Sequence, residues 1–234
     1  MKTSNKLLLG IFLTIIILTS IVQLTVYAKY KRGEFTSFKR EDLVPMNSLA
    51  VPAVRFISLK GLGSCAIKPS ETLKLEIQKD RADIIKYHVL NDTLYIDNPK
   101  VSGDQLERGS RTNGLVNIYL PASVQLNAAY SVFRVWGADD STSAPSYNIS
   151  LGKDCRLFIN FSGTKTASVY FNQLNINELK STIDLDRHVV INDLKMQLSD
   201  SKLNDNQATI RKLTVDTDDN STINLSGKNV KAIK

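Results

Sequence analysis

The amino-acid sequence predicts an all-β protein: a parallel β-solenoid (β-helix) with an N-terminal β-hairpin region, preceded by one transmembrane helix. One long uncharged run lies near the N-terminus, short β-type runs broken by turn residues follow it, and the last third repeats about every twenty residues. We therefore divide the 234 residues into a short basic N-terminus (1–6), a transmembrane anchor or signal peptide (7–28), a basic juxtamembrane linker (29–53) and a β-solenoid domain (54–234).

The uncharged run, residues 7–28, reads LLLGIFLTIIILTSIVQLTVYA. A helix of this length is about 33 Å long, which is enough to cross a hydrocarbon core of roughly 30 Å. Lys2 and Lys6 precede the run, and Val26-Tyr27-Ala28 resembles a signal-peptidase site. An uncleaved anchor is favoured because the run is longer than the apolar part of a usual signal peptide, which is the alternative. The first predicted partner is therefore the lipid bilayer, through residues 7–28.

The net charge of +7 is concentrated around this run, since residues 91–234 hold 16 Lys/Arg and 16 Asp/Glu. Lys29, Lys31 and Arg32 follow it directly and predict contact with anionic lipid head groups, unless they belong to a solvated linker. Nucleic-acid binding is excluded, because it would need basic residues spread over a folded face.

Two signals for membrane orientation disagree. The basic residues after the run, taken alone, would place the C-terminal flank in the cytoplasm. The signal-like layout of the N-terminus favours export instead. We expect a single-pass membrane protein whose folded domain is periplasmic or extracytoplasmic.

The first half of the folded domain contains β-type runs at residues 54–60, 73–78, 84–90 and 93–97. Asn91-Asp92 joins the last two as a hairpin turn. A loop is predicted at residues 102–114, followed by a strand at 115–120. Gly61-Leu62-Gly63 matches a loose dinucleotide-binding fingerprint, but Pro69 and a β run follow where that site needs a helix. We interpret it as a tight turn between strands.

Apolar residues of the last third align at intervals of about twenty residues, which indicates stacked circuits with three short strands each. The aligned sets are Leu174, Leu194 and Leu213; Ile176, Met196 and Val215; Ile183, Leu203 and Ile223; and Phe171, Ile191, Ile210 and Val230. Leu203 is expected to be buried between Ile183 and Ile223. Ser201 is aligned with Ser181 and Ser221. Replacing it with Ala should lower the free energy of unfolding far less than Leu203→Ala would, unless its hydroxyl is buried and hydrogen-bonded. The alternative is an ordinary β-sandwich with coincidental spacing.

Polar residues also align, and they form the one candidate site. Asp184 and Asp186 alternate with apolar residues, so both should point away from the core. The aligned strip consists of Asp184, Asp186, Asn204, Asn206 and Asn224. It could hold a sugar or a cation, or it could be a stacked polar column that satisfies neighbouring backbone groups.

No catalytic, cofactor-binding or metal-binding residues are predicted. The two histidines, His88 and His188, form no recognisable motif with a nucleophile or a metal ligand. Cys65 and Cys155 are too few for a disulfide framework, so buried free thiols are expected, with one bridge as the alternative.

The pattern of residues 54–97, a strand into Gly61-Leu62-Gly63, a second strand and a hairpin ending in DTLYI, resembles the opening of the GIN-domain family. Members of this family are also described as autotransporter adhesin head domains. The segment LVNIYLP at 115–121 resembles the next family segment, and the repeats resemble its β-helical body, so the resemblance covers residues 50–234. Where the family has small residues, this chain has bulky Tyr130, Phe133 and Trp136.

This resemblance implies an exported β-solenoid in the envelope of a Gram-negative bacterium, and it supplies no biochemical activity. The favoured hypothesis is a membrane-anchored, non-enzymatic binding or adhesion module whose ligand is an extracytoplasmic protein or glycan. The alternative is a carbohydrate-active enzyme on a β-helix scaffold.

Overall fold

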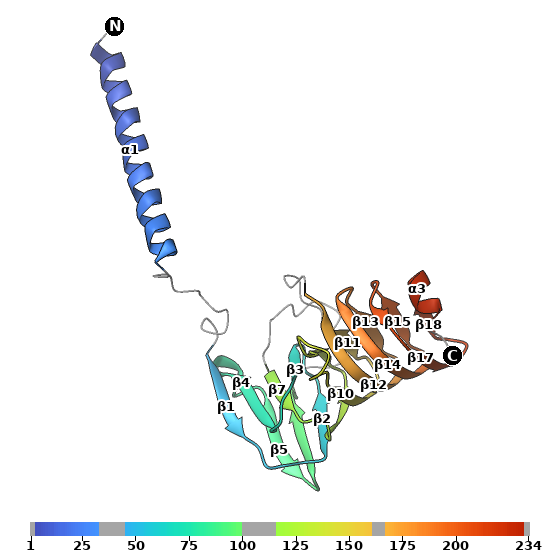
Figure 1. Ribbon diagram of the computed structural model, residues 1–234. Helices are drawn as coiled ribbons and strands as arrows, with labels where there is room; N and C mark the ends of the chain where they lie inside the picture. The colour runs from blue at the N-terminus through green and yellow to red at the C-terminus, as the bar shows by residue number, and fades with distance from the viewer. Residues whose placement is uncertain (1–2, 33–44, 100–115, 161–166, 232–234) are drawn as a thin grey trace. The chain divides into compact units, whose positions relative to one another are not determined.

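The computed structural model describes residues 3–32, 45–99, 116–160 and 167–231 (Figure 1). The chain divides into two units, Met1–Val44 and Pro45–Lys234. The loop predicted at 102–114 and part of the predicted linker lie outside the described residues.

The first unit contains one helix, α1 (Thr3–Lys31), which extends beyond the predicted run at both ends. Its segment Leu8–Lys31 has a mean hydropathy of 2.3 and is about 36 Å long at the usual helical rise. The hydroxyls of Thr14, Thr19, Ser20 and Thr25 each donate to the carbonyl four residues earlier, at 2.7–2.9 Å. These bonds satisfy the hydroxyls without water, as an apolar surrounding requires. By length and composition, α1 fits a membrane span or a signal sequence.

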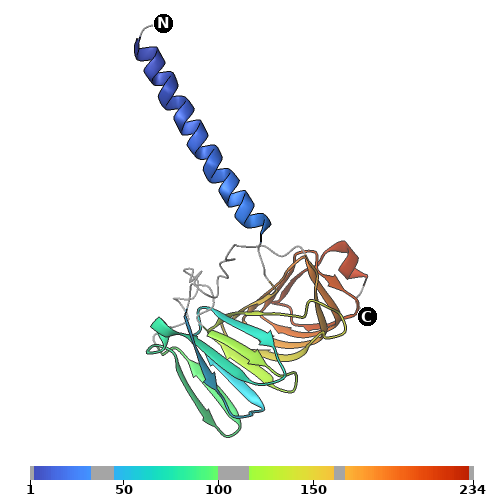
Figure 2. The same ribbon diagram turned by 60° about the vertical axis from the view of Figure 1, so that its left-hand side comes forward.

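The second unit is mostly β-sheet and consists of two stacked nine-stranded sheets (Figure 2). Sheet A contains, in spatial order, β1 (Met46–Ala50), β4 (Lys74–Gln78), β7 (Val116–Leu120), β3 (Cys65–Pro69), β9 (Val132–Val135), β11 (Arg156–Ile159), β13 (Thr182–Leu185), β15 (Lys202–Asp205) and β18 (Thr222–Asn224). Sheet B contains β16 (Thr209–Ile210), β14 (Val189–Ser199), β12 (Val169–Leu179), β10 (Ser146–Leu151), β8 (Gln125–Ala129), β2 (Phe56–Lys60), β6 (Thr93–Asp97) and β5 (Lys86–Leu90), with β17 (Leu213–Thr217) also paired to β14.

The N-terminal part of this unit corrects the predicted boundary at residue 54. Strand β1 lies inside the segment that the sequence indicated as linker, and it pairs antiparallel with β4. Its sequence MNSLA is only five residues long, and only Leu49 packs against the core, so β1 carries little periodic signal. Strand β3 was also not predicted, although the tight turn before it is present, with Gly61 at φ 66°.

The predicted hairpin is confirmed. Strands β5 and β6 pair antiparallel around Asn91 and Asp92, whose φ values are 47° and 61°. Positive φ at both central residues is what a two-residue turn of type I′ requires.

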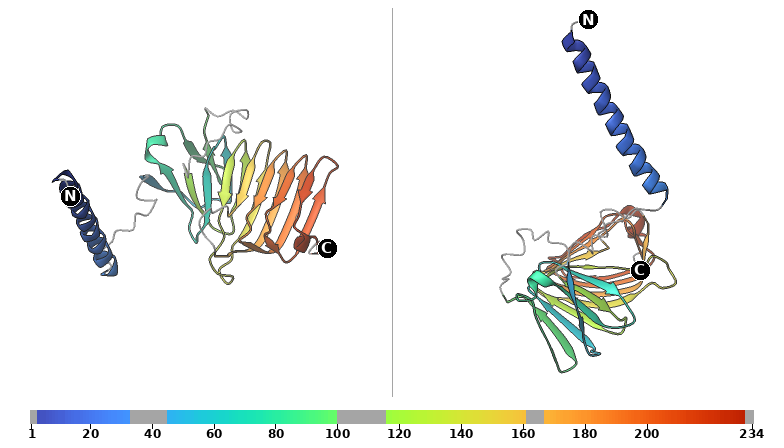
Figure 3. Two further views of the ribbon diagram at one scale, coloured as in Figure 1. Left: turned by 90° about the horizontal axis from the view of Figure 1, so that it is seen from above. Right: turned by 90° about the vertical axis from the view of Figure 1, so that its left-hand side faces the viewer.

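From β8 onward the chain alternates between the sheets, so that successive odd-numbered strands enter sheet A up to β15 (Figure 3). Each strand from β10 to β15 pairs in parallel with the strand that precedes it in its own sheet. The predicted alignments are confirmed by the register, since Leu174 pairs with Leu194 and Leu194 with Leu213.

One aligned residue was placed wrongly. Val230 belongs to a short helix, α3 (Gly227–Val230), and 53% of it is exposed, while Asn229 beside it is buried. Asn229 donates to Asp205 Oδ2 and to the carbonyl of Ala208, and its Oδ1 accepts from the N–H of Ile210. Helix α3, which follows the last strand, therefore buries an amide where an apolar side chain was expected.

The core lies between the two sheets, where inward residues alternate with outward ones along most strands. Leu203 is fully buried, and its register partners are Ile183 and Ile223, as predicted. Cys65 and Cys155 are buried free thiols. Burial raises the pKa of both, that of Cys155 to about 11.

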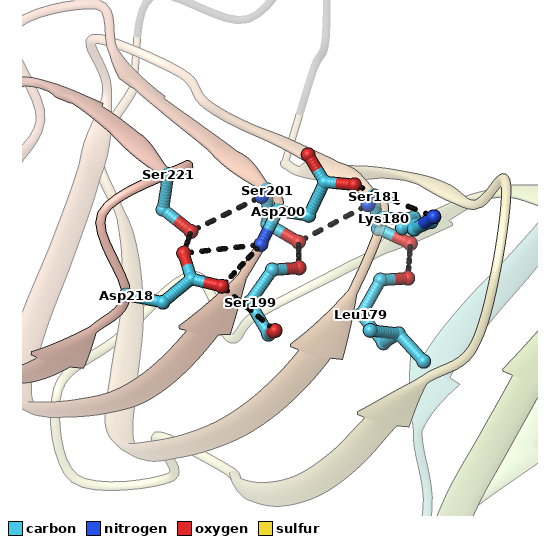
Figure 4. Close-up of polar contacts among 8 residues, drawn as sticks. All are labelled: Leu179, Lys180, Ser181, Ser199, Asp200, Ser201, Asp218 and Ser221. Atoms are coloured by element: carbon cyan, nitrogen blue, oxygen red, sulfur yellow. Dashed lines mark hydrogen bonds and ion pairs between the residues drawn. The ribbon is translucent and has the colours of Figure 1, made fainter.

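Serine side chains link neighbouring connections, each of which leads from a strand of sheet B to the next strand of sheet A (Figure 4). The N–H of Ser181 donates to Ser201 Oγ and the N–H of Ser201 donates to Ser221 Oγ, both at 3.1 Å. The residues before Ser181 and Ser201 are Lys180 and Asp200, both in the left-handed conformation. Ser201 also donates to the carbonyl of Ser199 at 2.8 Å and is buried. Its hydroxyl is thus buried and hydrogen-bonded, so we no longer expect Ser201→Ala to have a small effect on the free energy of unfolding.

Candidate binding faces

The predicted polar strip lies on the outer face of sheet A. Asp184, Asn204 and Asn224 occupy neighbouring positions on β13, β15 and β18. Asn204 Nδ2 donates to Asp184 Oδ1 at 2.9 Å, and Asn224 Nδ2 donates to Asn204 Oδ1 at 3.0 Å. These three residues therefore form one hydrogen-bonded ladder across the strands.

Arg156 of β11 completes this ladder, because its Nε donates to the second oxygen of Asp184 at 2.9 Å. Both carboxylate oxygens of Asp184 are engaged, and only 6% of the residue is exposed. A carboxylate held in this way fits the structural alternative for the strip better than acid–base chemistry.

Asp186 and Asn206 lie beside this ladder, at equivalent positions directly after β13 and β15. Their N–H groups donate to the carbonyls of Ile159 and Leu185, in the sheet A strand that precedes each one. Asp186 also lies close enough to Arg134 to oppose the effect of burial on the pKa of that guanidinium, which is lowered overall.

The register extends both rows to residues that the sequence did not suggest. The first row continues through Phe158, Arg134, Ala66, Asn117 and Glu76. The second has equivalent positions at Asn160 and Trp136 and continues to Lys68, Tyr119 and Lys74. We call this outer surface of sheet A the aromatic face.

Basic side chains lie over aromatic rings along the aromatic face. The guanidinium of Arg156 is 4.8 Å from the ring centre of Phe158, and that of Arg134 is 5.6 Å from Trp136. The ring of Tyr119 has Lys74 at 5.0 Å and Lys68 at 5.3 Å. Such pairs hold a ring and a cation together at a surface that a ligand can reach.

Two N–H groups at the centre of this face, Arg134 Nε and Trp136 Nε1, are buried. Neither donates a hydrogen bond to any group in the described part of the chain. At the far end Glu76 is well satisfied. Burial alone would raise its pKa, but hydrogen bonds from Lys74, Tyr119 and Asn117 outweigh it and hold the pKa below its ordinary value.

The spacing of the strands explains why the sequence did not reveal these residues. The paired residues Asp184 and Asn204 are 20 positions apart, but Phe158 and Asp184 are 26 apart and Arg134 and Phe158 are 24 apart. Only the alternation of buried and outward positions within each strand would have indicated their orientation.

No metal centre is evident in the described part of the chain, where His, Cys, Asp and Glu do not gather in groups of three or more. His88 stacks on Tyr95 with ring centres 5.0 Å apart, and His188 accepts from Arg187 Nε at 3.1 Å.

A groove of about 490 Å³ opens on the outer face of sheet B, where four strands end. It is lined by one outward polar residue from each of β10, β12, β14 and β17: Ser150, Asn177, Gln197 and Asp216. Leu179 and Ser199, which belong to the corner drawn in Figure 4, line its side. The sequence did not suggest this groove.

No protein-family model matches the chain, and no curated protein matches it. Solved structures that resemble it include a candidate lipid-binding protein from Parabacteroides distasonis (12% identity, covering 76% of this chain and 72% of that one, TM-score 0.39). Others are a candidate adhesin from Parabacteroides merdae (8%, 79% and 93%, TM-score 0.32) and a candidate cell adhesion protein from Clostridium sporogenes (14%, 75% and 100%, TM-score 0.32). At these identities and TM-scores, the resemblance assigns neither a family nor a function.

Proposed function

We propose that this chain is a membrane-held, non-enzymatic binding or adhesion module that displays its folded unit outside the cytoplasm. The folded unit would be a β-solenoid of the GIN-domain type, ended by α3. The observation that carries the proposal is the aromatic face, where Tyr119, Trp136 and Phe158 each lie beside a cation on one outer surface.

Such a face is suited to recognition because aromatic rings offer large contact area and the cations beside them offer directional hydrogen bonds. Both oxygens of Asp184 are used within the ladder, which holds this surface in a fixed arrangement. A rigid surface loses less entropy when a ligand binds. The ligand would be an extracytoplasmic protein or glycan.

Helix α1 would hold the module at the bilayer. Its last turn carries Lys29 and Lys31, and Lys31 Nζ lies 5.5 Å from the ring of Tyr27. Aromatic and basic residues at a helix end are typical of the membrane–water interface. Lys29, Lys31 and Arg32 would then meet anionic lipid head groups.

The test is binding of the full chain, in lipid nanodiscs, to intact cells of the native host and to their isolated cell-wall sacculi. We expect measurable co-sedimentation with one of these, weakened at least tenfold in Trp136→Ala/Phe158→Ala. Tyr87→Ala removes an exposed aromatic from sheet B instead and should bind as the original chain does.

Equal binding by the double variant and the original chain would contradict the assignment of the aromatic face, provided both melt at similar temperatures. The enzymatic alternative has its own readout in a panel of polysaccharides. Polysaccharide turnover that disappears in Asp184→Asn or Asp186→Asn would show that the chain is an enzyme and not a binding module.

A further inference from the structure

The groove on sheet B differs from the rest of that outer face in how its polar groups are used. In the neighbouring row, Asn175 Nδ2 donates to Asn148 Oδ1 at 2.7 Å, and Gln173 Nε2 donates to Asn175 Oδ1 at 3.0 Å. These amides satisfy one another. In the groove row of Ser150, Asn177, Gln197 and Asp216, no side chain is hydrogen-bonded to another group of the described protein. The groove row therefore keeps its donors and acceptors available for a ligand.

The geometry of this row restricts the shape of the ligand. Its four residues come from adjacent parallel strands in register, so their backbones are spaced by about 4.8 Å. An extended peptide advances roughly 3.3 Å per residue, so its residues could not each lie opposite a successive strand. One sugar ring in an extended, equatorially linked glycan spans about the distance between strands. A glycan running across the strands could thus meet one polar side chain with each sugar.

The charge and shape of the groove restrict the ligand further. The charged residues that line it are all acidic: Asp216, Asp218 and the buried Glu178. Asp218 is already held by Ser199 and Ser221. An acidic polysaccharide would be repelled, whereas uncharged hydroxyls can pair with the amides. Leu179, of which 48% is exposed, gives an apolar surface for the C–H face of a sugar ring.

We infer that the groove of Ser150, Asn177, Gln197 and Asp216 is a binding site for a neutral, linear glycan that lies across the strands of sheet B. This site is separate from the aromatic face and does not depend on it. The two can therefore be tested independently.

The experiment is calorimetric titration of the full chain in lipid nanodiscs, whose head groups carry no sugar. The probes are cellohexaose, chitohexaose, an acidic hexagalacturonate and a neutral ten-residue peptide. We expect one of the neutral hexasaccharides to bind with a dissociation constant below about 1 mM. The hexagalacturonate should bind at least tenfold more weakly.

The variant Asn177→Ala/Gln197→Ala should lose at least tenfold in affinity for that hexasaccharide, because two of the four polar contacts are removed. Asn127→Ala is the matched control, since Asn127 lies in the same row but outside the groove, and its affinity should change less than twofold. Failure of both neutral hexasaccharides to bind, tighter binding of the peptide, or undiminished binding by the groove variant would overturn the assignment.

Discussion

Glu178 occupies an inward position of β12, two residues after Ile176, where an apolar side chain is expected. Its register partners are Leu151 on β10 and Leu198 on β14. Only 5% of Glu178 is exposed, and neither carboxylate oxygen has a hydrogen-bonding partner among the residues that the structure describes. Burial without a partner disfavours the charged form and raises the pKa of Glu178 to about 8.

This burial predicts a specific pH dependence of stability. The folded chain holds the Glu178 proton more tightly than the unfolded chain, whose carboxyl has the ordinary pKa of 4.5. The contribution of Glu178 to the free energy of unfolding is therefore fully present below about pH 4.5 and is lost as pH rises through about 8. The loss in the free energy of unfolding is at most about 5 kcal/mol. Urea unfolding of the full chain in detergent should show a falling free energy of unfolding over this window.

Glu178→Gln provides the control, because an amide has the same shape and does not titrate. The fall in stability between the two ends of that window should largely disappear in this variant. An unchanged pH profile would mean that Glu178 gains a partner or water in solution.

Ser201 was predicted to be cheap to replace only if its hydroxyl was unpaired. The structure shows it buried, with Oγ bonded to Ser199 and to the N–H of Ser181. Ser201→Ala leaves the N–H of Ser181 without its acceptor, while the Ser199 carbonyl keeps the N–H of Lys180. The free energy of unfolding should therefore fall by about 1–3 kcal/mol. Thr214→Ala, at an exposed outward position, should change it by less than about 0.5 kcal/mol. Equal effects of the two would argue against the serine links.

At the scale of single residues, the serine alignment could be seen in the sequence, but its conformational cause could not. The left-handed residues before each corner include Tyr130, Asp154, Lys180 and Asp200. Tyrosine and lysine rarely adopt positive φ, so nothing in their chemistry marks these positions. All four residues lie in connections that lead from a strand of sheet B to a strand of sheet A, and that placement is defined only in three dimensions.

At the scale of elements, the strands of the last third could be predicted because their spacing is regular and their inward residues are apolar. The strands before residue 160 could not be aligned in the same way, since the connections between circuits vary in length there. Strand β1 was missed because it is short and only Leu49 of its residues packs against the core. Helix α3 was missed because the buried group is the amide of Asn229, which no apolar pattern reveals.

The position of Leu203 predicts a large cost for cutting back its side chain. Leu203 is fully buried, and its register partners are Ile183 and Ile223 on the two neighbouring strands, so Leu203→Ala removes packing and leaves a cavity. The free energy of unfolding should fall by about 2–5 kcal/mol. Val230→Ala trims an exposed apolar residue of α3 and serves as the control, with a change below about 0.5 kcal/mol. A small effect of Leu203→Ala, similar to that of Val230→Ala, would contradict close stacking of the circuits.

At the scale of the whole molecule, the sequence could predict an apolar helix followed by a mostly β unit, because both follow from composition and periodicity. The pairing of strands into two mixed sheets could not be predicted. The antiparallel strands β1, β4 and β5 join the parallel ones through contacts distant in sequence. The aromatic face and the groove both depend on that pairing, so neither was visible from the sequence alone.

The proposed membrane anchor predicts how the full chain behaves during extraction. Helix α1 exposes apolar side chains along its length, including Leu8, Phe12 and Leu24, and such a surface is stable in lipid rather than in water. The full chain should stay in the membrane fraction after carbonate and high-salt washes. Release by these washes, or a mature N-terminus at Lys29, would show that the segment is a cleaved signal sequence.

The central claim, a binding module displayed outside the cytoplasm, is tested most directly by the membrane topology of the full chain. Two reporters are fused in turn after Lys234 and expressed in the native host, one active only outside the cytoplasm and the other only inside it. The account predicts activity of the first reporter and silence of the second. Activity of the cytoplasmic reporter alone would show that the basic residues after α1 set the orientation, and it would contradict display of the module outside the cell's cytoplasm.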